Sequence, residues 1–375
     1  MAQARGLVLA APVAAPYAYP LFDNAALDGY AVRARDTTAA QPRQPLSLAI
    51  QGSQYAGQAW KLALKAGQAL HVTTGAPLPE GADALVPYES VRVDGKRLWL
   101  IRPADRGQNV RRQGEDARKG QRLAAKGELL HARRLALLAA FGVGTVRVQP
   151  QPRVAVAVSG DELLRPGRKP VPGRIFDSNT PALEASLNEL GLPAAALVRL
   201  PDQVAAQARV LKRLLKACDV LIVAGGMSVG ERDLGKSVLE SLGVRRVFWK
   251  VAQKPGKPLY FGVRGRQLVF GLPGNPAAVL SCFAAYVKPA LEALAARASS
   301  APVTARLAHD LAGTADKALF LKAQVEGSGA KATVTVLRGQ GSHLLRSLAD
   351  GNALLLRQPH EGPQKKGAPV KVILL

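Results

Sequence analysis

Hydrophobic and polar positions follow two different rhythms along the chain. Between residues 151 and 297, short apolar runs such as R153-V-A-V-A-V158 and V220-L-I-V-A224 alternate with longer segments of helical periodicity. Apolar runs of this length that alternate with helical patterns are typical of βαβ units. We therefore predict an α/β domain over residues 151–297, built on a parallel sheet with helices on both faces.

Helices are predicted at three places in this region. The segment T180-P-A-L-E-A-S-L-N-E-L-G191 has Thr180 as a helix N-cap and Gly191 as a stop signal. A second helix is expected over residues 202–217, and a third begins at Pro276.

The segments on either side of this domain show short alternating runs instead. Before residue 151, runs such as L46-S-L-A-I50 and R97-L-W-L-I101 are separated by Gly, Pro and Asp, which indicates a small β-rich domain. A helix is predicted over residues 131–140, ahead of a linker with two Gln-Pro pairs. Near the C-terminal end, runs such as A332-T-V-T-V-L337 indicate a second β-rich domain.

Charge and composition narrow the class of partner. The formal charge of +24 comes from 51 basic and 27 acidic side chains, scattered along the chain without zinc-finger spacing or an aromatic RNA-binding pattern. We therefore expect an anionic small molecule as the ligand and no nucleic-acid partner. Cys218 and Cys282 lie in apolar helical patterns, which suits a reducing, cytoplasmic setting. We expect no membrane span, because no apolar run reaches the required ~20 residues.

Three loops at the ends of predicted strands carry the candidate chemistry. They are S159-G-D-E162, G225-G-M-S-V-G-E-R-D233 and F270-G-L-P-G-N275. In a doubly wound sheet, ligands bind beyond the carboxyl ends of the strands, and glycines let backbone amides approach an anion closely. Anion capture is therefore predicted at Gly225, Gly226, Gly230, Gly271 and Gly274.

Acidic and basic side chains flank these loops. Glu162 and Asp233 would repel a phosphate unless a hard cation lay between them, so the pattern favours a phosphate bridged by Mg²⁺. The same acids, together with Asp161, could instead serve only as helix caps. Lys254 and Lys257 lie in a turn stiffened by prolines, which suits fixed contacts with phosphate or an oxyanion. A solvated basic turn is the alternative.

Gly226-Met227-Ser228-Val229-Gly230 also spells the G-x-S-x-G motif of hydrolase nucleophile elbows. A nucleophile elbow requires a helix immediately after the serine, whereas the helical pattern here resumes only at Ser237. The candidate bases His309, His343 and His360 have no evident orienting partner. A serine hydrolase that uses Ser228 is therefore the least favoured function, although it stays open.

Taken together and in order, these loops resemble the molybdopterin molybdenumtransferases, the family that includes the E domain of gephyrin. Nine motifs in the right order are far more specific than any one of them alone, and they span nearly the whole chain. They are F22-D-N-A-A-L-D-G-Y-A-V32, T74-G-A-P-L-P-E-G-A-D83, G107-Q-N-V-R-R-Q-G-E-D116, S159-G-D-E162, I175-F-D-S-N179, G225-G-M-S-V-G-E-R-D233, K254-P-G-K257, G271-L-P-G-N275 and G341-S-H343.

The resemblance implies an α/β multidomain fold with four domains. These would be an elongated helical or linker domain over residues 1–22 and 119–150, an inserted β-rich domain over 23–118, the α/β molybdopterin-binding domain over 151–297 and a C-terminal β domain over 298–375. It also implies a homodimer whose active cleft combines the α/β domain of one subunit with the inserted domain of the other. The implied reaction is Mg²⁺-dependent cleavage of adenylylated molybdopterin, with release of AMP and insertion of molybdate into the dithiolene.

Residue roles are carried over by motif. The residues implied to be catalytic are Asp28, Asp116, Glu162, Asp233, Lys254 and Lys257, and the implied metal ligands among them are Glu162 and Asp233. The residues implied to bind the substrate cofactor are Thr74, Ser159, Gly160, Gly225, Gly226, Ser228, Gly230, Gly271, Pro273, Gly274, Asn275, Lys322 and Ser342.

Two departures from the family pattern bear on these expectations. Lys322 stands where the family has an arginine on the molybdate side, so a point charge replaces a bidentate fork and oxyanion selection would weaken. The long helix that usually opens the family's chains is missing ahead of residues 5–9, which bears on the expected dimer contact. The alternatives to the transferase are therefore a catalytically weakened scaffold or a tungstate-using paralogue of the same fold.

Overall fold

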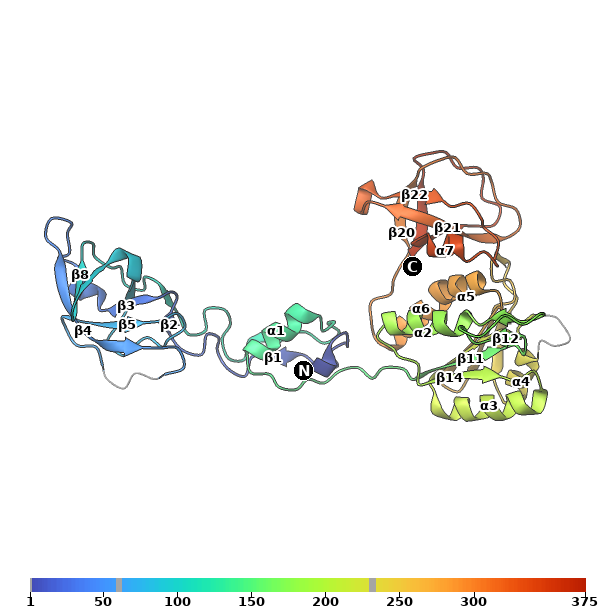
Figure 1. Ribbon diagram of the computed structural model, residues 1–375, viewed down its shortest axis with the longest axis horizontal. Coiled ribbons are helices and arrows are strands. Elements are labelled where there is room, and N and C mark those ends of the chain that lie inside the picture. Colours follow the sequence, from blue (N-terminus) through green and yellow to red (C-terminus); the bar gives the residue numbers. More distant parts are fainter. Residues whose placement is uncertain (1, 59–62, 229–233) are drawn as a thin grey trace. The chain divides into compact units, whose positions relative to one another are not determined.

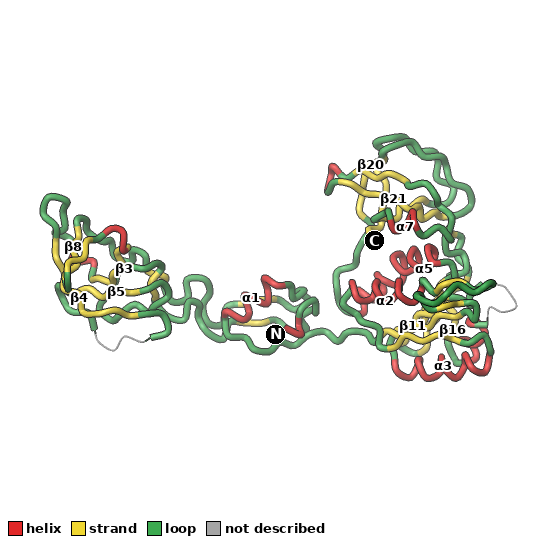
Figure 2. Tube along the Cα trace, in the orientation of Figure 1, coloured by secondary structure: helices red, strands yellow, loops and turns green. Residues whose placement is uncertain are grey.

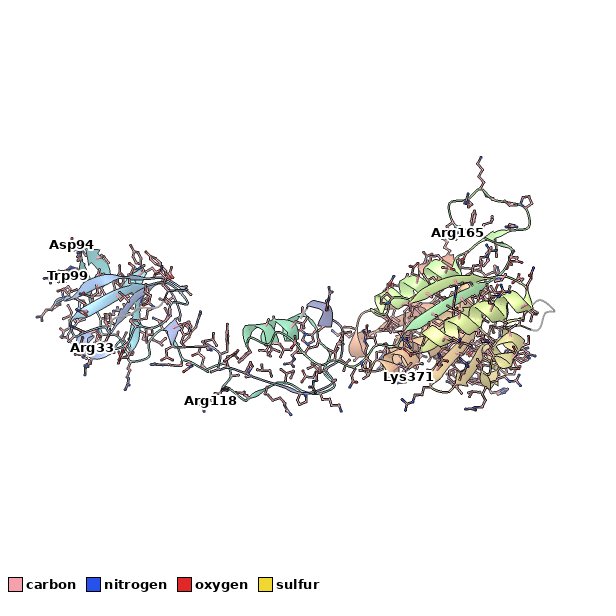
Figure 3. The ribbon with its side chains drawn as sticks, turned by 90° about the horizontal axis from the view of Figure 1, so that it is seen from below. Arg33, Asp94, Trp99, Arg118, Arg165 and Lys371 are labelled. Atoms are coloured by element: carbon pink, nitrogen blue, oxygen red, sulfur yellow. The ribbon has the colours of Figure 1, made fainter. Side chains whose placement is uncertain are left out.

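The computed structural model of the protein describes residues 2–58, 63–228 and 234–375 (Figures 1, 2 and 3). The chain divides into two compact units, residues 1–148 and residues 149–375. The division into four domains expected from the sequence remains a prediction.

Unit 1 is built around a six-stranded sheet. Its strands, in spatial order, are β6 (Ala84–Pro87), β3 (Gly29–Val32), β5 (Gln68–Val72), β4 (Leu46–Gln54), β8 (Arg97–Leu100) and β7 (Arg92–Asp94). Only the β4–β5 pair is parallel. Val32, Leu70 and Leu98 are fully buried against this sheet. The strands predicted over residues 46–50 and 97–101 are thereby confirmed as parts of β4 and β8.

The remaining elements of unit 1 are short. They are the strand pairs β1 (Val13–Ala14) with β10 (Arg122–Ala124) and β2 (Asn24–Ala25) with β9 (Val110–Arg111), the helix α1 (Ala132–Ala140), and 3-10 turns at Ala2–Ala4, Ala34–Thr37 and Tyr88–Ser90. The predicted helix is confirmed, and the side chain of His131 accepts a hydrogen bond from the Arg134 amide as its N-cap. Leu9, Leu130 and Leu138 belong to a separate core that β1, β10 and α1 share.

Unit 2 contains the predicted α/β sheet, with six strands. In spatial order they are β14 (Ala196–Leu200), β11 (Val154–Ser159), β15 (Val220–Ala224), β19 (Gln267–Leu272), β18 (Tyr260–Arg264) and β16 (Arg245–Trp249). The first four strands are parallel, but β18 is antiparallel to both of its neighbours. The sheet is therefore mixed rather than parallel throughout, because a two-residue loop joins β18 to β19 and such a loop joins only antiparallel strands.

Helices cover both faces of this sheet, as predicted (Figure 1). They are α2 (Asn179–Glu189), α3 (Val204–Ala217), α4 (Gly235–Ser241), α5 (Pro276–Cys282) and α6 (Lys288–Leu294), with a π turn at Phe283–Val287 between the last two. Alternate residues of β11 face opposite cores: Val156 packs with α2 and α5, whereas Ala157 packs with α3 and α4. This alternation places the strand between two helical layers.

The start of α2 differs from the expectation. Ser178, not Thr180, is the N-cap residue. The Asp177 carboxylate accepts hydrogen bonds from the Thr180 amide (3.0 Å) and from the Thr180 hydroxyl (2.6 Å), so the aspartate satisfies the free donor that a capping threonine would otherwise serve. Gly191 follows the end of the helix with φ +63°, which confirms it as the stop.

A second sheet of unit 2 is formed mainly by the C-terminal residues. Its strands, in spatial order, are β17 (Gln253–Lys254), β21 (Ala318–Glu326), β22 (Thr333–Val336), β20 (Val303–Leu307), β24 (Pro369–Leu374) and β23 (Ala353–Arg357), and β23 also pairs with β21. That pairing closes five of the strands into a ring. The remaining elements are α7 (Arg346–Ala349), a 3-10 turn at Gly329–Lys331 and the arm strands β12 (Leu163–Leu164) and β13 (Ile175–Phe176). The C-terminal β-rich domain is confirmed.

One helix, Pro276–Leu294, is long and apolar enough to cross a membrane by length and composition alone. Half of its most apolar window is buried inside the protein, and Val279, Val287 and Leu291 belong to the core under the sheet. Core helices of globular domains share this character.

Candidate functional site

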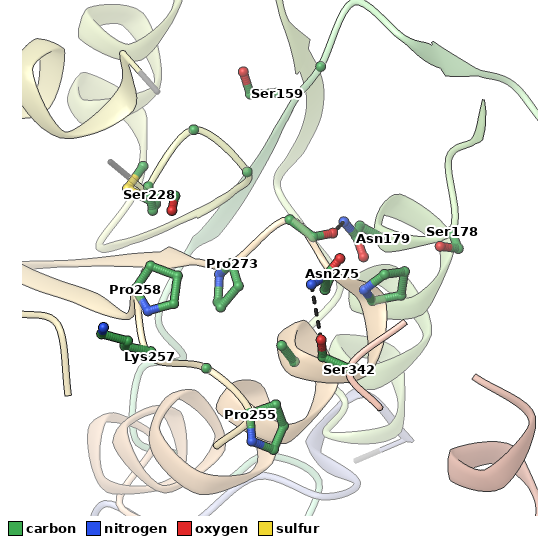
Figure 4. Close-up of a pocket in the computed structure, with 18 of the residues that line it drawn as sticks. Ser159, Ser178, Asn179, Ser228, Pro255, Lys257, Pro258, Pro273, Asn275 and Ser342 are labelled. Atoms are coloured by element: carbon green, nitrogen blue, oxygen red, sulfur yellow. Dashed lines mark hydrogen bonds between the residues drawn. The ribbon is translucent and has the colours of Figure 1, made fainter. Parts of the chain in front are cut away.

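A pocket of about 890 Å³ lies at the carboxyl ends of three parallel strands of unit 2 (Figure 4). The strands β11, β15 and β19 end at Ser159, Ala224 and Leu272, and the loop that follows each strand contributes to the pocket wall. Parallel strands direct their carboxyl ends to one edge of a sheet, so three loops distant in sequence meet there. The predicted site residues that line the pocket are Ser159, Gly160, Glu162, Gly225, Gly226, Ser228, Lys254, Lys257, Pro273, Gly274, Asn275 and Ser342.

Two glycines are required by this geometry. Gly225 has φ +86°, and a Cβ there would lie 2.8 Å from the carbonyl oxygen of Ser159. Gly160 has φ +144°, and a Cβ there would lie 2.8 Å from both carboxylate oxygens of Glu162. Both positive φ values favour glycine, and at Gly225 the backbone carbonyl of Ser159 leaves no room for a side chain. The Glu162 carboxylate lies beside the backbone of Gly160.

Asp202 also lines the pocket, although the sequence pattern predicted it only as the start of a helix. Its carboxylate accepts a hydrogen bond from the Ser159 hydroxyl (3.0 Å) and another from the Asp161 amide (2.9 Å). The first loop is therefore held by a carboxylate that follows β14, the neighbouring parallel strand. Ligands bind beyond the carboxyl ends of parallel strands, so a strand predicted over residues 196–200 would have pointed to Asp202.

The turn that carries Lys254 and Lys257 is held by buried side chains. Gln253 is buried and donates a hydrogen bond to the Gly256 carbonyl (3.2 Å), and its side-chain oxygen accepts one from the Tyr286 hydroxyl. A Cβ at Gly256 would overlap the sulfur of Cys282, which is buried in α5. Both lysines are exposed on the pocket wall, so a rigid turn presents two cations to the pocket.

Two asparagines join the loops to one another. Asn179, at the start of α2, donates a hydrogen bond to the Gly274 carbonyl (2.9 Å). Asn275 donates a hydrogen bond to the hydroxyl of Ser342 (3.0 Å), drawn as the dashed line in Figure 4. The loop between β22 and α7, residues 337–345, is thus attached to the loop that follows β19.

Gly271 and Lys322 do not line the pocket. Gly271 lies within β19, and a Cβ there would overlap the sulfur of Met227, so this glycine makes room for a side chain rather than for an anion. Lys322 lies in β21 and is 2% exposed. Its ammonium donates hydrogen bonds to the carbonyls of three residues and to one hydroxyl, namely Gly339, Gly341, Leu344 and Ser347. A direct contact with molybdate does not fit this arrangement, because the ammonium protons are already engaged.

Asp28, Thr74 and Asp116 lie in unit 1. The Asp28 carboxylate accepts hydrogen bonds from the Thr74 amide (2.6 Å) and the Thr74 hydroxyl (2.8 Å). These two bonds hold the pKa of Asp28 below its usual value, because they favour the charged carboxylate. Asp116 is exposed, and its amide donates to the Tyr19 carbonyl (3.1 Å). The structure therefore pairs two of these three residues with each other.

Two predicted residues, Gly230 and Asp233, lie outside the described residues. Across residues 2–58, 63–228 and 234–375, no three or more His, Cys, Asp or Glu side chains gather in a group that could hold a metal ion. Both cysteines are buried and free. None of the described pocket-lining residues is a histidine, so the pocket offers Ser228 no base of the kind that a Ser-His hydrolase uses.

The fold and the pocket define a class of protein. Glycine-containing loops at the ends of parallel strands, two exposed lysines and the carboxylate of Glu162 line a pocket typical of proteins that bind small molecules, and a C-terminal β ring contributes Ser342 to its wall.

Comparisons with known proteins identify the family. Family models match as the MoeA N-terminal region (domain I and II) over residues 1–142, a probable molybdopterin binding domain over 155–293 and the MoeA C-terminal region (domain IV) over 304–375. Molybdopterin molybdenumtransferase 2 of Mycobacterium tuberculosis is 35% identical, over 95% of this chain and 89% of its own length. The molybdopterin molybdenumtransferase of Haemophilus influenzae is 32% identical, over 99% and 91%.

A solved structure is similar over the whole chain. The crystal structure of the molybdopterin biosynthesis moea protein from Pyrococcus horikosii covers 100% of this chain and 92% of its own, with 33% identity and a TM-score of 0.80. The chain belongs to the molybdopterin molybdenumtransferases, a family of enzymes, and the resemblance seen in the sequence is confirmed.

Proposed function

We propose that this enzyme cleaves adenylylated molybdopterin, releases AMP and transfers molybdate to the dithiolene of molybdopterin. The observation that carries the proposal is the convergence of three strand-end loops and two lysines on one pocket. A diphosphate with an attached nucleoside is the kind of ligand that such a pocket suits, because it combines several negative charges with a bulky organic part. The names of the relatives support molybdopterin as the substrate.

Within this proposal, the residues of unit 2 have separate roles in binding and catalysis. The backbone amides of Gly226 and Gly274 bind phosphate oxygens, since no side chain screens them. Lys254 and Lys257 balance the negative charge that develops on the diphosphate and the departing AMP, and they attract molybdate. Their turn is rigid in the free protein, so little reorganisation is needed when the substrate binds.

The carboxylates fit a magnesium ion in part. Mg²⁺ in proteins is commonly bound by one or two carboxylates together with waters and substrate phosphates, so a cluster of three acids is not needed. Glu162 lies on the pocket wall with no side-chain hydrogen bond among the described residues and is the proposed ligand. Both oxygens of Asp202 already accept hydrogen bonds, so we assign that carboxylate to the loop. When bound, Mg²⁺ would polarise the phosphoryl oxygens.

The proposal extends to assembly and location. We propose a homodimer in which Asp28, Thr74 and Asp116 of one subunit complete the site of the other. The Asp28–Thr74 pair supports it, since an exposed carboxylate held by two hydrogen bonds is a polar group fixed in one orientation at the surface of unit 1. We also propose a cytoplasmic location, because the two buried thiols are unoxidised.

Incubation with adenylylated molybdopterin, Mg²⁺ and molybdate tests the function. The transferase releases AMP and yields metal-loaded molybdopterin. Binding of the nucleotide without AMP release would instead support a scaffold that has lost activity. Parallel reactions with tungstate distinguish a tungstate-using paralogue. Ester hydrolysis that disappears in Ser228→Ala would overturn the proposal in favour of a hydrolase.

A further inference from the structure

The first part of the glycine loop after β15 is anchored by a buried methionine. Met227 is 1% exposed and, like its neighbours Gly226 and Ser228, contributes to the wall of the pocket. The Met227 side chain occupies the space that side chains at Gly235 and Gly271 would need, since a Cβ at either glycine would overlap it. Met227 therefore fits between α4 and β19, and its position fixes the backbone on both sides of it.

A tryptophan from a distant strand holds the same residue. The indole N–H of Trp249, the last residue of β16, donates a hydrogen bond to the Met227 carbonyl (2.9 Å). The ammonium groups of Lys236 and Lys250 lie over the Trp249 ring, 4.1 and 4.4 Å from its centroid. These cations favour a fixed ring orientation through cation–π attraction. Trp249 itself does not line the pocket.

We propose that Trp249 is a positioning residue for anion binding, acting through Met227 on the backbone of Gly225 to Ser228. The hydrogen bond from the indole holds the carbonyl of Met227 in place, and the peptide groups next to it are oriented by the same bond. Two further bonds, Gly225 amide to Leu272 carbonyl (3.1 Å) and Gly235 amide to Gly226 carbonyl (3.1 Å), hold the neighbouring residues. This inference rests on the proposed function, since it assumes that this segment binds phosphate.

The test uses the full-length protein and pyrophosphate with Mg²⁺ as the probe, measured by calorimetry. Trp249→Phe replaces the indole with a smaller aromatic ring and removes the N–H, and we expect the dissociation constant of pyrophosphate to rise by about tenfold, the value of one net hydrogen bond. Trp99→Phe, a tryptophan of β8 in unit 1, is the matched control and leaves the constant unchanged. Met227→Ala weakens binding as well, and combining it with Trp249→Phe gives less than the sum of the two effects, because both act through one residue.

The dissociation constant itself is the readout that a purely structural role would not change. An unchanged dissociation constant in Trp249→Phe would overturn the inference and leave the proposed function standing. Failure of the wild type to bind pyrophosphate would overturn both. A melting temperature that falls in Trp249→Phe while pyrophosphate affinity is retained would show that the indole serves stability alone.

Discussion

The buried ammonium of Lys322 offers the sharpest perturbation of the C-terminal side of the pocket. Its Nζ lies 2.6–2.9 Å from its four acceptors, and three of these are carbonyls within the 337–345 loop. The main chain of Lys322 also exchanges hydrogen bonds with the side chain of Gln340, at 2.9 Å each. Lys322→Met removes the ammonium but keeps an unbranched chain that fills the same space.

The magnitude follows from these contacts. Three ammonium protons in charge-assisted hydrogen bonds, at ~1.5–3 kcal/mol each, give a gross loss of roughly 5–9 kcal/mol. Two effects reduce this gross loss of free energy. Gly339 and Leu344 are exposed, so water can replace the ammonium at their carbonyls. Methionine also avoids the cost of burying a cation. Burial lowers the pKa of Lys322, which indicates that this second effect is present. We expect a net loss of about 3 kcal/mol in the free energy that keeps the loop closed.

Hydrogen exchange measures this loss locally, which avoids assuming two-state unfolding of a chain with several folded units. A loss of about 3 kcal/mol speeds amide exchange in residues 337–345 by roughly 100-fold. Lys365→Met is the matched control: Lys365 pairs with Asp310 at 2.8 Å but is exposed, so its loss has little effect on stability. Unchanged exchange in the loop, with weaker molybdate binding, would refute this reasoning and return Lys322 to the oxyanion contact inferred from the family.

Three further predictions concern other parts of the molecule. Asp202→Asn deprives the first loop of one acceptor, so kcat/KM for AMP release falls by about tenfold, and an unaltered value would contradict its anchoring role. Thr74→Val removes a hydroxyl that stabilises the Asp28 carboxylate, so the pKa of Asp28 rises toward its usual value in an NMR titration; a constant pKa would count against the pairing. Burial raises the pKa of Cys218 to about 11 and that of Cys282 to about 12, so both thiols stay protonated at pH 8. We expect a disulfide reagent to label them only after unfolding, and rapid labelling of the native protein would contradict their burial.

Much of the site was predictable because its residues follow parallel strands. Ser159, Gly225 and Gly274 all come soon after a buried apolar run, and a parallel sheet brings such positions together whatever their separation in sequence. Asp202 was missed because the run at residues 196–200 is short and contains Arg199, which weakens the strand signal.

The sequence could not reveal the surroundings of Lys322 or Gly271. The acceptors of Lys322 are mostly backbone carbonyls, which every residue possesses, so no residue pattern marks them. Gly271 occurs in a glycine-rich loop motif, but whether such a glycine faces a ligand or a side chain depends on packing in three dimensions. The antiparallel direction of β18 likewise follows from its two-residue connection to β19 and not from the composition of the strand.

The central claim is that the strand-end loops and the Glu162 carboxylate hold a diphosphate through Mg²⁺. The most direct measurement is the Mg²⁺ dependence of AMP release from adenylylated molybdopterin, compared between the wild type and Glu162→Gln. We predict that the wild type releases no AMP in the presence of a chelator and that Glu162→Gln needs at least tenfold more Mg²⁺ for half-maximal release. Release by the wild type at full rate without Mg²⁺, or an identical Mg²⁺ requirement in both proteins, would contradict it.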